Sequence, residues 1–555
     1  MQAETKICQN CKQDFTIEPD DFAFYEKMKV PAPTWCPMCR LQRRLSHRNE
    51  RTLYHRKCDL CGKSMISIYH PGGENVVYCR ECWWSFDKWD PLDYGQEFDF
   101  SKPFFEQWRQ LANAVPRNGL INSNSVNSEY TNLAADNKDC YMLFESSNNE
   151  RCNHSYWMQL SKDCLDCAFV NNSELCYEVF VAYNCYKLFF SKECRDCTDS
   201  YFLQDCVGCS NCYGCVGLRK KQYHILNQPY SKEEYFKILE EKKKQIRHGN
   251  VEDLKKEFKN FVLKQINKYA YVQKSVRSTG NYLLNTKNCT HCFHGDDAEN
   301  CKYGYHVWRN SKDNMDVCTV GRDAELVYES INSAMKAYGI KFGIQNWNGN
   351  SDLEYCEACS ASSNLFGCVG LHAKQYCILN KQYAKESFEA LRTKIIAHMK
   401  SALEYGEFFP TELSQFSYNE TSAFDHFPLT KKQAIAQGFK WHDQEEKNVT
   451  VGGDIFGCVH EGKCQDNCTV GFKVIQAEKD FYEKMDLPIP KFCPNCRHYE
   501  RLKQRNPLKL WHRQCACDKQ HPHHTGRCQN EFETSYAPDR PEPVYCEQCY
   551  NAEVA

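Results

Sequence analysis

The first 100 residues contain four CxxC pairs and no unpaired cysteine. These pairs are Cys8 with Cys11, Cys36 with Cys39, Cys58 with Cys61, and Cys79 with Cys82. A tight turn of this kind presents two thiolates to one ion, and two such turns complete a tetrahedral zinc site. Four pairs therefore predict two closed four-thiolate sites, which form a double zinc module over residues 1–100.

The last hundred residues copy this module. FYEKMKVPAPTWCPMCR at 24–40 aligns without a gap with FYEKMDLPIPKFCPNCR at 481–497. We therefore predict a second zinc module over residues 456–555, and about four zinc ions per chain. Its predicted ligands are Cys464, Cys468, Cys493 and Cys496 for one site, and Cys515, Cys528, Cys546 and Cys549 for the other.

The copy departs from its template at two places. CQDNC at 464–468 is one residue longer than CxxC, and Cys458 lies nearby as a spare candidate ligand. CACDKQHPHHTGRC inserts residues between two ligands of the last site, so Cys515 or Cys517 can be its fourth ligand. The insert also carries His521, His523 and His524.

Residues 7–40 and their copy at 464–497 resemble a treble-clef, zinc-ribbon-like domain family. The shared features are CxxC, an aromatic residue as in CKQDF, an FY pair and CPxCR. The resemblance implies a small zinc-stabilised fold of a kind that binds nucleic acid or protein more often than it catalyses. Closed four-thiolate sets agree with this, because catalytic zinc needs an open coordination position.

A basic segment joins the two ligand sets of each module. Arginines on phosphates, with aromatic rings such as Tyr54 and Trp511 on bases, are typical of nucleic-acid binding. We predict contacts with structured RNA or DNA through Arg40, Arg43, Arg44, Arg48, Arg51, Arg497, Arg501, Lys503 and Arg505. The alternatives are a protein partner, or a solvated helix face whose arginines pair with neighbouring acids.

The middle of the chain repeats. Cys164, Cys185 and Cys206 are evenly spaced in the sequence, and short aromatic pieces alternate with polar turn clusters. This pattern predicts a parallel β-solenoid of about 21-residue coils over 120–230. A second stack is predicted over 280–383, because GCVGLHAKQYCILNKQY at 367–383 resembles GCVGLRKKQYHILNQPY at 214–230.

We expect capping helices over 231–275, and a helix with a linker over 384–455. The predicted fold is therefore mainly β with α, with two zinc modules flanking a central double solenoid. The solenoid cysteines have three possible roles: small buried residues in columns, metal ligands as in the run from Cys206 to Cys215, or disulfides between coils.

Composition narrows the function further. The formal net charge is −2, no long apolar run can span a membrane, and the N-terminus has no apolar secretion signal. We therefore expect a cytoplasmic protein with reduced thiols. We find no common catalytic motif and expect a non-enzymatic protein that binds nucleic acid. The alternatives are an assembly scaffold that uses the solenoid surface and, third, a carbohydrate-active solenoid enzyme.

Overall fold

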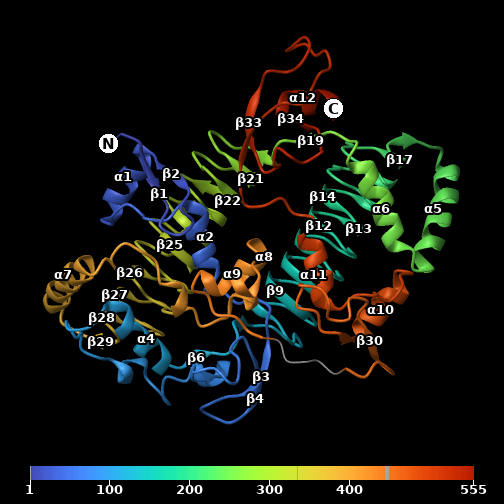
Figure 1. Ribbon diagram of the computed structural model, residues 1–555. Helices are drawn as coiled ribbons and strands as arrows, with labels where there is room; N and C mark the ends of the chain where they lie inside the picture. Colours follow the sequence, from blue (N-terminus) through green and yellow to red (C-terminus); the bar gives the residue numbers. More distant parts are fainter. Residues whose placement is uncertain (1, 334, 444–448, 555) are drawn as a thin grey trace.

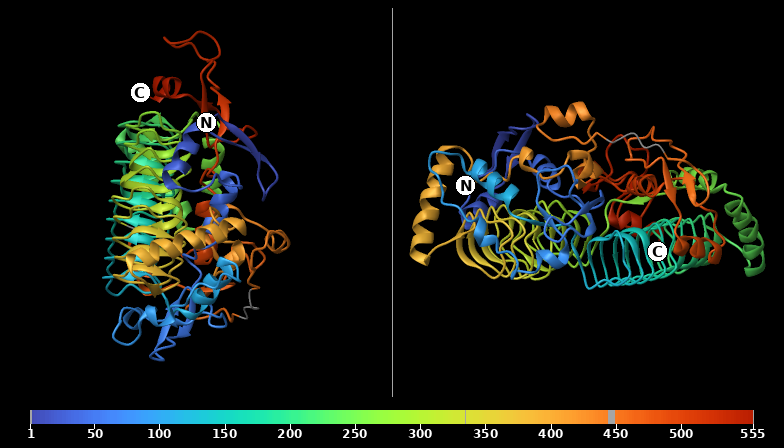
Figure 2. Two further views of the ribbon diagram at one scale, coloured as in Figure 1. Left: turned by 90° about the vertical axis from the view of Figure 1, so that its left-hand side faces the viewer. Right: turned by 90° about the horizontal axis from the view of Figure 1, so that it is seen from below.

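The computed structural model describes residues 2–333, 335–443 and 449–554. The protein is a mixed α/β molecule with extensive parallel sheets (Figure 1). It has cysteine groups near both ends of the chain. Two stacks of parallel strands form one side of the molecule, and the terminal segments cover the other side (Figure 2). No helix in the described ranges is long and apolar enough to cross a membrane.

The first stack contains two sheets between Arg117 and Pro229. One sheet has β7 (Asn122–Ser123), β8 (Asn132–Ala135), β9 (Tyr141–Ser147), β10 (Asn153–Gln159), β11 (Ala168–Asn171), β12 (Phe180–Tyr183) and β14 (Lys192–Arg195). The other has β13 (Tyr186–Phe189), β15 (Thr198–Tyr201), β16 (Ser210–Tyr213), β17 (Gln222–Ile225) and β18 (Gln228–Pro229). Only the last pairing, β17 with β18, is antiparallel among the described strands of these two sheets.

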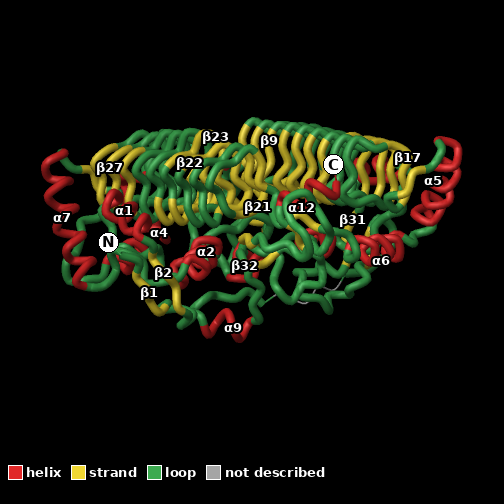
Figure 3. The backbone as a smooth tube through the Cα atoms, turned by 90° about the horizontal axis from the view of Figure 1, so that it is seen from above, coloured by secondary structure: helices red, strands yellow, loops and turns green. Residues whose placement is uncertain are grey.

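The second stack follows the same plan. Its first sheet has β20 (Val272–Gln273), β21 (Gly280–Leu284), β22 (Cys292–Glu299), β23 (Tyr305–Lys312), β24 (Met315–Val320) and β25 (Tyr328–Ser333). Its second sheet has β26 (Ser351–Glu354), β27 (Ser363–Phe366), β28 (Gln375–Ile378) and β29 (Lys381–Gln382). The strands of both stacks form one long row when the molecule is seen from above (Figure 3).

The pairing register corrects the predicted length of the coil. In the first stack Tyr156 pairs with Ala168, and Ala168 pairs with Phe180, so that each partner lies twelve positions further along the chain. The second stack mixes this step with steps of thirteen positions, as between Lys302 and Met315. The wider spacing of Cys164, Cys185 and Cys206 is therefore not the distance between paired strands.

A three-residue unit explains that spacing. Through the first stack a residue with φ near +50° recurs at every third position, beginning at Asn124 and Asn127. Each of the twelve cysteines of this stack directly follows such a residue, as Cys140 follows Asp139. Asn and Asp tolerate left-handed backbone better than most residues and fill many of these positions. The spacing between Cys164, Cys185 and Cys206 is a multiple of three positions. These cysteines therefore occupy the same place in the three-residue unit, and all of them point into the stack.

The interior cysteines form part of the core of each stack. Cys164, Cys167 and Cys176 are fully buried among apolar side chains. The thiol of Cys164 donates to the carbonyl oxygen of Lys162 at 3.2 Å. All cysteines are free, so the structure contains no disulfide between coils in its described part. Cys318 differs, because it lies in the core shared with the N-terminal module.

The early strands of the two stacks lie side by side, and the stacks run in opposite directions from there. Trp157 donates from its indole nitrogen to Nδ1 of His306 at 2.9 Å, and Phe169 stacks on His294 with ring centroids 4.4 Å apart. Further along the first stack, Glu193 accepts a hydrogen bond from the hydroxyl of Tyr282. Contacts that advance along one stack thus move backwards along the other.

Helices follow each stack. The first stack leads into α5 (Lys232–Arg247), whose Ser231 and Glu234 form the predicted capping box, and then into α6 (Val251–Val262). The second stack leads into α7 (Lys385–Ser401). The predicted linker contains η2 (Thr411–Leu413), η3 (Tyr418–Glu420), α8 (Ser422–His426) and α9 (Lys431–Ala436). Positions 444–448 of this linker lie outside the described residues.

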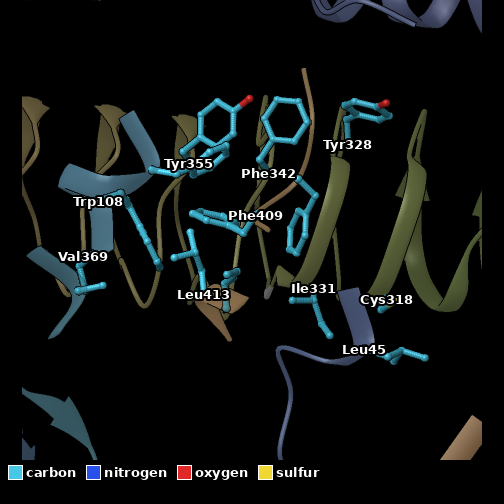
Figure 4. Packing of buried hydrophobic residues seen from close by; sticks show 14 of the residues in the cluster. Leu45, Trp108, Cys318, Tyr328, Ile331, Phe342, Tyr355, Val369, Phe409 and Leu413 are labelled. Atoms are coloured by element: carbon cyan, nitrogen blue, oxygen red, sulfur yellow. The ribbon is translucent and has the colours of Figure 1, made fainter. Parts of the chain in front are cut away.

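The linker packs into a shared core. Phe409 and Leu413 are buried beside Trp108 of α4 (Phe104–Ala114) and Tyr355 of the second stack (Figure 4). The rings of Trp108 and Phe409 have centroids 4.5 Å apart. Three segments that are far apart in sequence are therefore held together by one aromatic cluster.

The two terminal modules have the same order of elements. The N-terminal module has β1 (Glu4–Ile7), β2 (Asp14–Ile17), α1 (Pro19–Met28), α2 (Pro37–Leu45), β3 (Tyr54–Lys57), β4 (Ser64–Ser67), β5 (Val77–Tyr78) and α3 (Arg80–Trp83), followed by η1 (Pro91–Tyr94). The C-terminal module has β30 (Ile455–Gly457), β31 (Gly471–Lys473), α10 (Gln476–Lys484), α11 (Pro494–Leu502), β32 (Trp511–Gln514), β33 (Glu531–Thr534), β34 (Val544–Tyr545) and α12 (Glu547–Val554).

Each terminal module touches both stacks. In the N-terminal module, β5 pairs in parallel with β6 (Arg117–Asn118) at the start of the first stack, while α2 packs on β24 and β25 of the second. In the C-terminal module, β34 pairs with β19 (Asn267–Lys268) at the start of the second stack, while α11 packs on β10 of the first. The two modules thus make equivalent contacts, but the stack that one module contacts through a strand is the stack that the other contacts through a helix.

Candidate metal centres

The structure brings cysteines together in four groups of four. Within each group all sulfur atoms lie within 4.8 Å of one another, so that each group can hold a metal ion. The groups are Cys8, Cys11, Cys36 and Cys39; Cys58, Cys61, Cys79 and Cys82; Cys458, Cys468, Cys493 and Cys496; and Cys515, Cys528, Cys546 and Cys549. Cysteine groups are therefore present at both ends of the chain, and three of the four have the predicted members.

A hairpin supplies the first ligands of each centre, and the N-terminal end of a helix supplies the others. In the first centre, Cys8 follows β1, while Cys36 is the N-cap of α2. The backbone N–H of Cys36 donates to the sulfur of Cys8 at 3.1 Å. A thiolate at a helix N-terminus is stabilised by the backbone N–H groups there.

The same backbone hydrogen bond recurs in every centre. Its N–H donors are Cys36, Cys79, Cys493 and Cys546, and its sulfur acceptors are Cys8, Cys58, Cys458 and Cys515, at 3.1–3.3 Å. Hydrogen bonding from the neighbouring thiols lowers the pKa of Cys36 to about 5 and that of Cys493 to about 4. Both thiols are thus biased towards the form that binds metal.

The third centre differs from the sequence-based assignment. Cys458 follows β30 as Cys8 follows β1, and it accepts the recurring hydrogen bond, from Cys493. Cys458 therefore takes the place that the CQDNC pattern assigned to Cys464. The sulfur of Cys464 lies 3.7 Å from that of Cys496. Cys464 is nevertheless not a member of this group of four, in which every sulfur lies within 4.8 Å of all the others. The hairpin turn between Cys458 and Cys468 is much longer than a CxxC turn, so CxxC spacing does not identify these two cysteines as a ligand pair.

At the fourth centre, Cys515 and not Cys517 joins the other three predicted ligands. Cys515 accepts the backbone hydrogen bond from Cys546 and groups with the other three predicted ligands. Cys517 lies instead in an overlapping group with His521, His524 and Cys549. The sequence shows both histidines in the insert but does not assign them to a site.

The predicted nucleic-acid contacts of α2 are buried. Arg40 and Arg44 are almost inaccessible to solvent, and Nη2 of Arg40 lies 2.7 Å from Oδ2 of Asp316. Nη1 of Arg44 lies 3.1 Å from Oε1 of Glu329, and Nη1 of Arg43 lies 3.0 Å from Oε2 of Glu407. Asp316 and Glu329 belong to β24 and β25, so these ion pairs fasten the N-terminal module to the second stack.

Helix α11 repeats this arrangement on the first stack. Both Arg497 and Arg501 form ion pairs with Asp166, and for Arg501 the distance from Nη1 to Oδ1 is 2.7 Å. Arg497 also pairs with Glu478, which lies 3.0 Å from Nε2 of His154. Burial alone would raise the pKa of Glu478, but His154 and Arg497 lower it to about 2.

The remaining predicted contacts are also engaged within the molecule. Arg48 pairs with Glu50 and Glu145, and Arg51 contacts His498. Arg505 donates to the backbone of Asp425, and Lys503 pairs with Asp466 and Glu500 while its side chain stays 56% exposed. Eight of the nine basic residues are thus buried or half-buried. Acids on the stacks and on neighbouring segments already pair with most of them, so these residues do not form a shared exposed basic surface in the described structure, and their contacts with nucleic acid stay a prediction.

Comparison with known proteins adds no name to these centres. A scan against protein-family models and a search of curated proteins both found no match to this chain.

Proposed function

We propose that this chain is a non-enzymatic, zinc-dependent scaffold protein. Its two parallel stacks are β-solenoids of short coils, and its terminal modules are zinc modules that hold the solenoids together. Zinc in the four cysteine groups folds the modules. The folded modules then hold α2 and α11 against the solenoids. The observation that carries this proposal is the exchanged docking of the modules, each of which pairs with one stack through a strand and with the other through a helix.

Zinc suits these groups for chemical reasons. Four thiolates in a tetrahedral set are typical of structural zinc and of iron–sulfur sites. Such small modules depend on the metal for folding, because they contain little apolar core of their own. A set of four thiolates also leaves no open coordination position at the ion. This chemistry supports a structural role and gives no support to zinc catalysis.

The docking of the modules depends on their fold. Arg40, Arg43 and Arg44 are correctly placed only while α2 starts at Cys36, a ligand of the first centre. Removing the metal would free the helix start and with it the arginines that pair with Asp316 and Glu329. Asp316 and Glu329 would then lose the arginines with which they pair, and nothing would hold α2 at this place on the second stack.

The partner surface of the proposed scaffold is the outer face of the solenoids. A hollow of about 680 Å³ on the second stack is lined by side chains of both charges, among them Asp297, Asp323, Arg309 and Arg322. Mixed charge suits a protein surface better than the uniformly negative backbone of nucleic acid. A nucleic-acid partner remains an untested prediction, and the burial of the α2 and α11 arginines does not favour it.

Elemental analysis with metal removal tests the proposed function. The purified full chain should contain at least four zinc ions, and a strong chelator should lower its unfolding midpoint by well over 10 °C. Readdition of Zn²⁺ should restore the midpoint, while Mg²⁺ should not. A chain with fewer than four bound zinc ions, or one that keeps its midpoint after zinc is removed, would reject the proposal.

A further inference from the structure

A second set of metal-ligand atoms lies beside the fourth centre. The ligand atoms of Cys517, His521, His524 and Cys549 all lie within 4.8 Å of one another. Cys549 also belongs to the group with Cys515, Cys528 and Cys546. Cys517 and Cys549 are fully buried. Two complete sets of four ligands therefore share a single sulfur atom.

An insertion supplies the new ligands. In the N-terminal module only two residues separate Cys58 from Cys61, whereas twelve separate Cys515 from Cys528. The longer loop is ordered by its own backbone hydrogen bonds. Cys528 donates to the carbonyl of Cys517 at 2.8 Å, and His521 and His524 exchange N–H to carbonyl hydrogen bonds at 3.1 and 3.2 Å. Residues paired in this way project their side chains to the same side.

Hydrogen bonds orient the histidines. Nδ1 of His524 lies 2.9 Å from the carbonyl oxygen of Gly526, so this nitrogen carries the proton. Nε2 of His524 is then free to act as a ligand, and it lies 3.2 Å from the sulfur of Cys549. A carbonyl acceptor on the second nitrogen is typical of metal-binding histidines.

His521, the other residue of the hydrogen-bonded pair, completes the set. Its Nε2 is shielded from solvent and forms no hydrogen bond within the described part of the chain. Oε1 of Glu553 lies 3.4 Å from this nitrogen. A shielded imidazole nitrogen without a hydrogen bond is costly unless something binds it. A metal ion among these four ligands would satisfy it.

We propose that the fourth centre holds two zinc ions bridged by the thiolate of Cys549. One ion is bound by Cys515, Cys528, Cys546 and Cys549, and the other by Cys517, His521, His524 and Cys549. Two sulfur and two imidazole ligands are a common structural zinc set. Binding of the second ion releases the thiol proton of Cys517 to solvent. This inference rests on the proposed zinc binding only through Cys549.

Native mass spectrometry of the full chain tests the second ion. The double variant H521A/H524A should bind one zinc fewer than the wild type. The control variant H512A should bind the same number as the wild type, because His512 is exposed on β32 and pairs only with Glu531 and Glu533 in the described structure. Equal zinc content in H521A/H524A and wild type would overturn the inference and leave the four-zinc proposal intact. A wild-type chain without zinc would instead reject the proposed function.

A spectroscopic readout separates a lost ion from a misfolded module. When the chain is reconstituted with Co²⁺, spins that share a thiolate bridge couple, and the coupling weakens their electron paramagnetic resonance signal. The signal per bound cobalt should therefore be lower for the wild type than for H521A/H524A. Equal signals per cobalt in the two proteins would overturn the bridged pair, whatever the stability of the variant.

Discussion

Arg40 and Asp316 form an ion pair that is closed to solvent, although the two residues are far apart in the sequence. Nη2 of Arg40 lies 2.7 Å from Oδ2 of Asp316, and the two side chains are 1% and 0% exposed. Asp316 also lies 3.4 Å from Nη2 of Arg44. One carboxylate therefore pairs with two arginines of α2 where the N-terminal module meets the second stack.

Removing this carboxylate should destabilise the protein strongly. The variant D316A leaves Arg40 and Arg44 buried without their shared partner, and the expected loss is about 3–5 kcal/mol in the free energy of unfolding. Urea denaturation followed by tryptophan fluorescence measures it. The control D163A breaks the pair of Asp163 with the 42% exposed Arg151 and should cost less than about 1 kcal/mol. Similar losses in the two variants would show that the buried pair does not hold the module.

Acid should loosen the contact between the stacks. Burial, assisted by nearby Arg505, lowers the pKa of His294 to about 3, while an unfolded histidine titrates near 6.5. The unfolded state therefore binds the proton first, and stability present above pH 6.5 is lost as pH falls towards 3. The slope from this one group is at most about 1.4 kcal/mol per pH unit.

The variant H294F isolates this contribution. It keeps a ring against Phe169 and removes the titrating group, so its stability should fall less steeply than that of the wild type between pH 6.5 and 4.5. Protonation of the metal-ligand thiols affects both proteins and cancels in the comparison. H248A removes an exposed histidine at the end of α5 and should keep the wild-type slope. An unchanged slope in H294F would contradict the assignment.

Interior cysteines should differ from cysteines of the metal centres. Cys206 begins the run of four cysteines at three-residue spacing, and its thiol can donate to the carbonyl oxygen of Gln204 or of Cys215, each 3.5 Å from the sulfur. C206A should therefore cost about 1 kcal/mol of stability, as a small cavity does, and leave the metal content unchanged. C39A should remove one zinc. Loss of metal, or of iron, in C206A would assign the run to a cluster.

The third centre provides a test between neighbouring cysteines. Cys458 occupies the place of Cys8, and Cys464 lies outside the group of four. C458S should lose one zinc per chain by native mass spectrometry, and C464S should retain it. The opposite result would restore the assignment suggested by the CQDNC spacing.

The parts that could be predicted from sequence are those encoded locally. CxxC spacing locates the N-terminal centres, because each turn carries both of its ligands, and Ser231 with Glu234 predicts the start of α5. Spacing alone does not identify Cys458 as a ligand, because a long hairpin separates it from its partner ligand Cys468. The strict three-residue placement of Cys140, Cys152 and later cysteines was present in the sequence, and it is a better guide than the longer cysteine period.

The direction in which the arginines face could not be predicted. Arg40 at helical spacing from Arg44 indicates a basic face, but it does not show what covers that face. The covering acids, Asp316 and Glu329, lie in strands of the second stack that meet α2 only in the folded chain. A pattern within one segment carries no information about such a partner, so the arginine spacing alone predicts an exposed basic face.

Hydrogen–deuterium exchange before and after zinc removal tests the central claim most directly. The claim is that metal in the terminal modules holds α2 and α11 against the stacks. After chelation, amides of α2 and α11 should exchange much faster, while strands in the middle of each stack, such as β11, should stay protected. Unchanged protection of α2 and α11 in the zinc-free chain would contradict the account.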